Sequence, residues 1–248
     1  MTTTPSPAVD GVEIKFTVAR AGLDAAMASY QLKDDDARKR DVFFFDELDP
    51  ATRFPRLLGA AIVLRLRRKK GGSGTTTLKL RPADADRLTG DFAAGSGVFA
   101  DYTVEVDWSN RQVLAASMNV DVAEGRVAAV LDAGGPIRGL FAADQLRLLD
   151  EAGTPPPDPF GPLRTAGPIT THRWDDVADG ELAGLRAERW TYLDNAFLEL
   201  SLRAKDLDEA DRLRTALLKD IDDRGIELDP STTSKTETVL RDFLSAGG

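Results

Sequence analysis

The stretch VLRLRRKKGGSGTTTLKL (residues 63–80) decides the fold, because charged and apolar residues alternate on both sides of a glycine-rich turn. Strict alternation predicts a β-strand with one apolar face and one polar face. The turn at 70–74 therefore joins two predicted strands, 60–69 and 75–82, into a hairpin. Leucines occupy one face of this hairpin, and the other face carries cations: Arg65, Arg67, Lys79 and Arg81.

The charged face of the hairpin has two interpretations. An antiparallel strand usually packs its apolar face on the core and leaves its charged face in water. Four cations on neighbouring strands nevertheless repel one another, and like charges on opposed positions destabilise a sheet. Each close pair costs up to about 4 kcal/mol at an effective dielectric constant of about 20. Such clustering is reasonable when an anion neutralises it, as in a barrel with charged residues inside and helices over an apolar exterior.

The rest of the chain supplies further elements of the same kind. Short alternating segments predict a largely antiparallel sheet, and segments with helical spacing flank it. The interval 33–40 reads as a charged connection, and 154–162 as a proline-rich loop. Strands are predicted at 12–18, 41–48, 98–108, 112–122, 125–131, 169–174, 181–193 and 197–205. Helices are predicted at 22–32, 137–153, 206–224 and in the tail 231–244.

Composition excludes several classes of site. The 248 residues contain no cysteine and a single histidine, so thiolate catalysis, disulfides and a two-histidine metal site are impossible. A metal would sit mostly on carboxylates, which favours Mg²⁺, Mn²⁺ or Ca²⁺ over zinc. A net charge of −9 argues against non-specific nucleic-acid binding. The sequence shows neither a signal peptide nor a membrane span, so we expect a soluble, cytoplasmic protein with no membrane partner.

The order of several short motifs resembles the CYTH superfamily, the triphosphate tunnel metalloenzymes. The hallmark of that family is a first-strand E-x-E-x-K motif, and GVEIK (11–15) matches it in Glu13 and Lys15, with Gly11 in place of the first glutamate. An R-x-R strand, a lysine on the return strand and a mid-strand acid follow. In this chain the R-x-R strand corresponds to Arg65 and Arg67, the lysine to Lys79 and the acid to Glu105. The second half matches through Arg173 in THRWDD, Glu199 in FLELSL and Lys235 in TSKTETVL.

The resemblance implies an α+β fold, a closed or nearly closed antiparallel eight-stranded β tunnel with flanking helices. It covers 11–244 as one domain, with an inserted helix and proline-rich loop at about 132–165, and 1–10 is expected to be disordered. It also implies divalent-metal-dependent hydrolysis of a triphosphate-containing substrate, either inorganic tripolyphosphate or an organic triphosphate, with Lys15 and Glu199 as catalytic residues. The implied partner is a triphosphate-containing small molecule or inorganic polyphosphate. The implied substrate-binding residues are Lys15, Arg65, Arg67, Lys79, Arg81, Arg173 and Lys235. The implied ligands for Mg²⁺ or Mn²⁺ are Glu13, Glu105, Glu188 and Glu199, with one metal polarising the phosphoryl group and a second activating water.

Two departures from the family pattern leave the activity open. Gly11 and Ser201 each remove a carboxylate from an E-x-E pair, which lowers the expected metal affinity. The first hypothesis is a triphosphatase with fewer carboxylate ligands for its metal ion. The second is a catalytically weak or inactive protein that binds phosphate compounds in the same tunnel. A third is a barrel with a solvated interior whose outer surface binds a protein partner.

Overall fold

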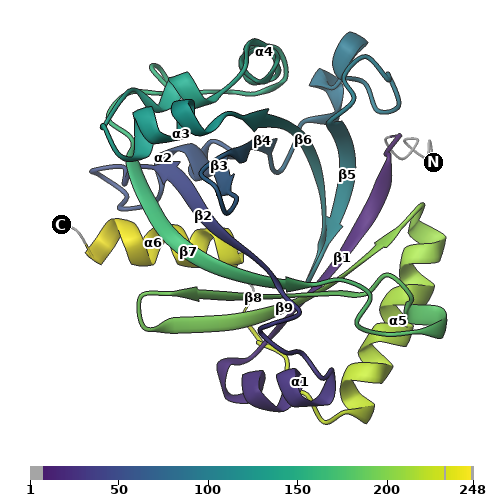
Figure 1. Cartoon of the computed structure of the whole chain (residues 1–248). Coiled ribbons are helices and arrows are strands. Elements are labelled where there is room, and N and C mark those ends of the chain that lie inside the picture. Colours follow the sequence, from purple (N-terminus) through teal and green to yellow (C-terminus); the bar gives the residue numbers. More distant parts are fainter. Residues whose placement is uncertain (1–7, 232, 247–248) are drawn as a thin grey trace.

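A closed β-barrel forms the centre of the molecule (Figure 1). The computed structural model describes residues 8–231 and 233–246. The strands of this part are β1 (Gly11–Val18), β2 (Arg38–Asp46), β3 (Ile62–Arg68), β4 (Gly74–Leu80), β5 (Tyr102–Trp108), β6 (Gln112–Val122), β7 (Arg164–Trp174), β8 (Arg186–Tyr192) and β9 (Asn195–Ala204). The predicted α+β architecture with a closed barrel and flanking helices is confirmed, with nine strands among the described residues in place of the expected eight.

The strand order round the barrel is β1-β5-β6-β4-β3-β2-β7-β8-β9. Neighbouring strands pair antiparallel throughout, except that β1 pairs with β5 in parallel. The parallel pair places Gly11 opposite Glu105 and Glu13 opposite Asp107. β1 therefore lies between β5 and β9, and its pairing with both strands closes the barrel.

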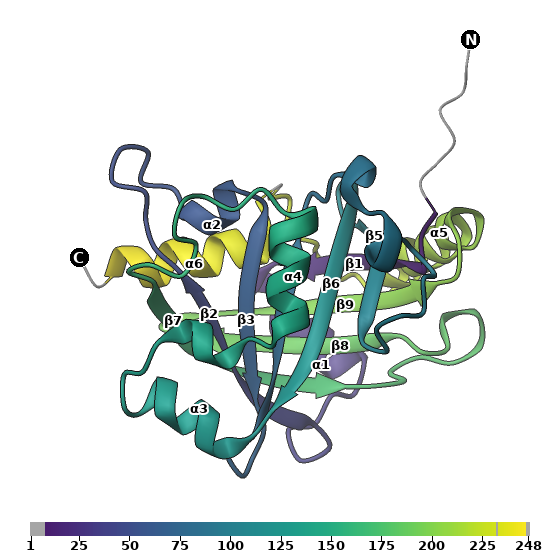
Figure 2. The same ribbon diagram turned by 90° about the horizontal axis from the view of Figure 1, so that it is seen from above.

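Helices flank the barrel. They are α1 (Leu23–Ser29), α2 (Arg56–Gly59), α3 (Glu124–Leu131), α4 (Ala143–Ala152), α5 (Leu207–Asp223) and α6 (Lys235–Ala246). The apolar stripe of α5 packs on the buried face of β1, and α4 lies over β4 and β6 (Figure 2). Gln145 of α4 is fully buried and donates hydrogen bonds to the carbonyls of Thr76 and Met118. No helix of the described residues is long and apolar enough to cross a membrane.

Helix α6 closes one end of the barrel. On β2, Val42 and Phe44 lie opposite Arg67 and Arg65, so these two apolar residues share the inner face with the arginines. They form one buried cluster with residues of α6 and with aromatic residues of β8. The cluster contains Val42, Phe44, Ala166, Ile169, Trp190, Tyr192, Val239, Leu240 and Leu244. Figure 1 shows α6 beside β7, on the opposite side of the view from α5.

Two local predictions were wrong. The segment 125–131 was expected to continue the sheet, but it lies in α3, where Val127 and Val130 are buried at helical spacing and alanines favour the helix. The interval 33–40 was expected to be a connection, but its last three residues begin β2, where Arg38 pairs with Arg173. Strong local charge hid this strand end, because a charged residue of it, Arg40, faces the interior of the barrel beside Arg67 and Arg173.

The predicted disorder of residues 1–10 concerns mostly residues that the structure does not describe. Of the stretch 1–10, expected to be disordered, residues 1–7 lie outside the described residues. Asp10 hydrogen-bonds through its backbone N–H to the Val104 carbonyl, and its carboxylate accepts from the N–H groups of Gly95 and Val104. Asp10 therefore fixes the start of β1 beside β5.

Candidate functional site

The charged faces of the strands point into the barrel. Leu64, Leu66 and Leu78 are buried in the outer core together with leucines of α4, so the alternate residues Arg65 and Lys79 face the interior. The same alternation holds on β1, where the apolar residues pack under α5 and the charged ones face inward. The interior thus collects residues from every part of the chain: Glu13, Lys15, Arg40, Arg65, Arg67, Lys79, Arg81, Glu105, Asp107, Arg173, Glu188, Glu199 and Lys235.

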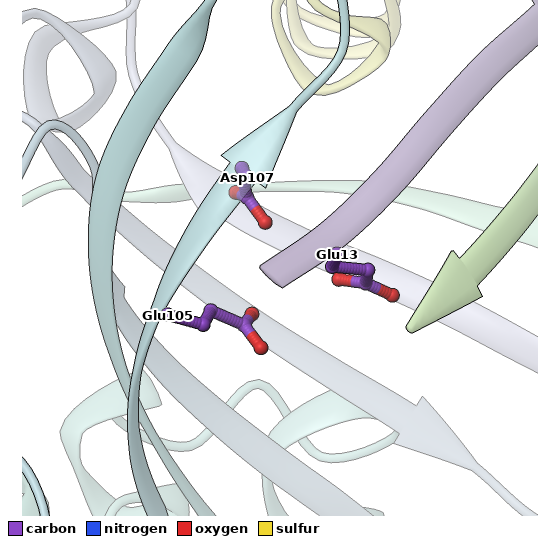
Figure 3. A group of neighbouring side chains, drawn as sticks. All are labelled: Glu13, Glu105 and Asp107. Atoms are coloured by element: carbon purple, nitrogen blue, oxygen red, sulfur yellow. The ribbon is translucent and has the colours of Figure 1, made fainter. Parts of the chain in front are cut away.

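Three carboxylates form an acidic group on β1 and β5. Glu13, Glu105 and Asp107 each offer an oxygen, and these oxygens all lie within 4.8 Å of one another (Figure 3). Carboxylate oxygens are the ligands that Mg²⁺ and Mn²⁺ prefer, so this donor set fits such an ion. Glu13 and Glu105 were predicted as metal ligands, whereas Asp107 was not. Its signal was present in the sequence, because Asp107 follows Glu105 by two residues and so shares its face of the strand.

The acidic group is neutralised by neighbouring cations. Asp107 is almost fully buried and contacts Lys15 at 3.2 Å, Lys79 at 2.8 Å and Arg81 at 2.7 Å. Burial raises the pKa of Asp107, but the charges of Lys15 and Lys79 outweigh burial and hold the pKa well below its ordinary value. Glu13 lies 2.5 Å from Lys15. Burial again raises its pKa, and Lys15 and Lys79 lower it from 4.5 to about 2.

Lysine 15 connects the carboxylates of this group. Burial alone lowers the pKa of Lys15, yet the negative charges of Glu13 and Asp107 raise it above its ordinary value. The Lys15 ammonium group therefore stays charged at neutral pH. It is available both to hold the acidic group together and to attract an anion that enters the barrel.

Three interior arginines lack an acidic partner. Among the described residues, no carboxylate lies within 4.0 Å of the guanidinium nitrogens of Arg40, Arg65 or Arg67. Arg65 donates to the Thr77 hydroxyl at 3.0 Å, and its buried Nε has no hydrogen-bond partner within the described chain. Burial, and then repulsion from Arg67, lowers the pKa of Arg65 from 12.5 to about 9. Burial and the same neighbour lower the pKa of Arg40.

Unpaired buried cations are unfavourable in an empty site. A buried charge without a partner costs free energy, and the cost is relieved when an anion supplies hydrogen-bond acceptors. Arg65 and Arg67 were predicted to bind substrate. Arg40 was not, because the sequence pattern placed it in a connection. No local signal marks it, since its neighbours Arg67 and Arg173 come from other strands.

A second acidic pair lies apart from the first group. Glu188 of β8 lies opposite Glu199 of β9, and Arg173 of β7 lies opposite Glu188. Glu199 is in contact with Lys235 at the start of α6. The acidic group of β1 and β5 includes neither Glu188 nor Glu199, although both were predicted as ligands. Burial, and then repulsion from Lys15, lowers the pKa of Lys235 from 10.5 to about 7.

The two ends of the barrel differ in exposure. Where β2 and β8 begin, Asp175 contacts Arg38 at 3.4 Å, Arg173 at 2.6 Å and Arg186 at 3.7 Å. The side chain of Arg38 is 70% exposed there, whereas Val42 and Phe44, which pack against α6, are 0% and 1% exposed. The opposite end is covered by α6. We call the exposed end, marked by Arg38, Arg173, Arg186 and Arg203, the arginine end of the barrel.

Comparison with solved structures gives the fold its context. A proposed adenylate cyclase from Bacillus halodurans has 15% sequence identity and a TM-score of 0.56, covering 91% of this chain and 95% of the other. A proposed adenylyl cyclase from Hippeastrum, described as having a dominant triphosphatase activity, also has 15% identity and a TM-score of 0.56, covering 96% of both chains. The chain has the fold of the triphosphate tunnel proteins. No protein-family model and no curated protein matches it by sequence.

Gly11 and Ser201, the two departures from the family motif, both lie on strand faces that point into the interior. Gly11 lies opposite Glu105, beside the acidic group. Ser201 lies between Lys15 of β1 and Arg186 of β8. Each missing carboxylate therefore falls next to retained charged residues, and the tunnel of this chain carries more cations than acids.

Proposed function

We propose that this protein binds a triphosphate-containing small molecule inside the barrel and hydrolyses it with the help of Mg²⁺ or Mn²⁺. The observation that supports the proposal is the set of unpaired arginines, Arg40, Arg65 and Arg67, facing the same interior as the acidic group. Arginine binds phosphate oxygens through paired, charge-assisted hydrogen bonds. A linear polyanion is the ligand whose charge matches such an interior.

Each group has a distinct task in this proposal. The arginines grip the oxygens of the triphosphate and neutralise the charge that develops on it during transfer. Lys15 and Lys79 contact the carboxylates of the acidic group, so they would orient a phosphate beside those carboxylates. Glu13, Glu105 and Asp107 would hold the divalent ion, which supplies Lewis-acid polarisation of the phosphoryl group when bound. The closed end under α6 limits the entry of bulk water from that side.

A second function, tight binding without turnover, is favoured by one specific observation. Every carboxylate of the acidic group already has a cation partner, and Gly11 and Ser201 supply no further ligand. A divalent ion must displace these cations, which weakens its binding.

Arg65→Gln tests the proposal, because binding and stability should move in opposite directions. The wild type and the variant are incubated with tripolyphosphate, ATP or thiamine triphosphate in Mg²⁺ or Mn²⁺, and phosphate release is measured. We expect kcat/KM to fall at least tenfold in the variant, while its free energy of unfolding is unchanged or higher, since an unpaired buried charge is removed. Lys219→Gln, which alters an exposed pair with Asp223 on α5, is the matched control.

The outcomes separate the candidate functions. Phosphate release that depends on Arg65 supports hydrolysis. Binding of tripolyphosphate without release, measured by calorimetry, supports the binding function. If wild-type protein neither binds nor hydrolyses any of the three compounds, the proposed tunnel ligand is wrong, and a partner on the outer surface becomes the remaining hypothesis.

A further inference from the structure

The side chain of Arg203 crosses a strand to reach the acidic group. Arg203 belongs to β9 and lies opposite Glu13 of β1. Its guanidinium nevertheless donates to the Glu105 carboxylate on β5 at 3.2 Å, on the far side of β1. This route passes over Gly11, which lies opposite Glu105.

Gly11 is what makes this crossing possible. A Cβ atom at Gly11 would lie 3.3 Å from Nε of Arg203 and 3.0 Å from the backbone oxygen of Ala204. A side chain at position 11 would therefore crowd the path of the arginine, which would have to shift by a few tenths of an ångström to admit even a Cβ atom. The glycine that removes a carboxylate from the motif thus also admits a cation in its place.

The arginine changes the charge balance of the acidic group. Glu105 is buried, and it already has Lys79 at 3.3 Å. With Arg203 it carries two cation partners. The side chain of Arg203 is 46% exposed at the arginine end, and its hydrogen bond to Glu105 is its one side-chain bond within the described residues. Most of its five donors are therefore free for a ligand.

We propose that Arg203 is a phosphate-binding residue of the barrel interior, and that Gly11 leaves the space through which its side chain reaches Glu105. The inference rests on the proposed function in that its ligand is a triphosphate. A divalent ion bound to Glu13, Glu105 and Asp107 competes with Arg203 for Glu105. The guanidinium has further donors beside the one that it gives to Glu105, and these would bind phosphate oxygens with or without such an ion.

If the pair of Arg203 with Glu105 were purely structural, the expected results would differ. A half-exposed pair contributes at most about 1 kcal/mol to stability. Its removal would leave the binding of tripolyphosphate nearly unchanged. Its removal would still strengthen metal binding, because Glu105 would lose a competing cation, so the tripolyphosphate titration is what separates the two interpretations.

The test measures two affinities on the same variants by titration calorimetry. Inorganic tripolyphosphate is titrated without metal, and Mn²⁺ is titrated without phosphate, into wild type, Arg203→Ala, Arg203→Lys and Gly11→Ala. Arg212→Ala, which removes an exposed arginine of α5 paired with Glu181, is the control. Urea unfolding of each variant verifies that it is folded.

The proposal expects changes of opposite sign. Arg203→Ala should weaken tripolyphosphate binding about tenfold, as expected for the loss of a charge-assisted contact, and should strengthen Mn²⁺ binding because Glu105 loses a competing cation. Arg203→Lys should fall between wild type and Arg203→Ala, since lysine lacks the planar fork. Gly11→Ala should weaken tripolyphosphate binding severalfold although no charge changes.

Three results would overturn the inference. These are equal tripolyphosphate affinity in wild type and Arg203→Ala, weaker binding of both ligands in Arg203→Ala, and no binding of tripolyphosphate by wild type. The last result also rejects the proposed function. Wild-type binding that depends on Arg203 without any phosphate release supports the inference and rejects only the hydrolytic step.

Discussion

Replacing Glu13 by glutamine should destabilise the protein in a manner that depends on pH. Glu13 lies 2.5 Å from Lys15, and its pKa is lowered from 4.5 to about 2. Each pKa unit corresponds to about 1.4 kcal/mol, so the lowering corresponds to roughly 3 kcal/mol. The side chain is 23% exposed, which screens the interaction, and Lys15 keeps Asp107 as a partner at 3.2 Å. We therefore expect Glu13→Gln to lower the free energy of unfolding by about 2 kcal/mol at pH 7.

The pH dependence follows from the direction of the shift. The carboxyl of Glu13 has a lower pKa in the folded state, so its contribution is present above pH 4.5 and is lost as pH falls toward 2. Urea unfolding at pH 7, 5 and 3 should show the difference between wild type and Glu13→Gln shrinking to about half or less at pH 3. Glu151→Gln, in an exposed pair with Arg147, should change stability by less than about 0.5 kcal/mol at each pH. A difference that stays constant from pH 7 to pH 3 would refute the ion-pair reasoning.

Two further predictions concern α6. Burial and Lys15 lower the pKa of Lys235 to about 7, so an anion that binds nearby should raise this pKa. Calorimetry of tripolyphosphate binding at pH 8, in buffers of different ionisation enthalpy, should therefore show proton uptake that is smaller in Lys235→Met than in wild type. Equal proton uptake in both proteins would contradict this assignment. Leu240 is 2% exposed in the cluster that closes the barrel. Leu240→Ala should lower the free energy of unfolding by about 3 kcal/mol in urea denaturation, and a loss below about 1 kcal/mol would show that α6 is not packed as described.

Much of the site could be predicted because strand alternation is a local property. Arg65 and Arg67 were assigned to a charged face from the spacing of residues within one hairpin, and the structure confirms that this face is the inner one. The same period-two pattern identified Glu13, Lys15 and Lys79. Asp107 lies outside the family motif, although its position two residues after Glu105 places it on the same face of the strand and in the same acidic group.

Other parts of the site depend on which strands become neighbours. The parallel pairing of β1 with β5 brings Glu13 next to Asp107 across about ninety residues of chain, and nothing in either segment specifies that partner. Arg40 acquires its cationic neighbours only when β2 pairs with β3 and β7. The strand count and the helix at Glu124–Leu131 were also settled by packing, since a short apolar run suits either a strand or a helix.

By itself, the amino-acid sequence determined that alternating strands would form a sheet with one face of leucines and one face of cations and acids. Residue spacing fixes which side chains share a face, because successive Cβ atoms point to opposite sides of a strand. Only the tertiary structure decided that this charged face is enclosed, and that Arg203 crosses over Gly11 to reach Glu105. The physical reason is that closure and strand register are set by contacts between segments distant in the chain, which no local pattern records.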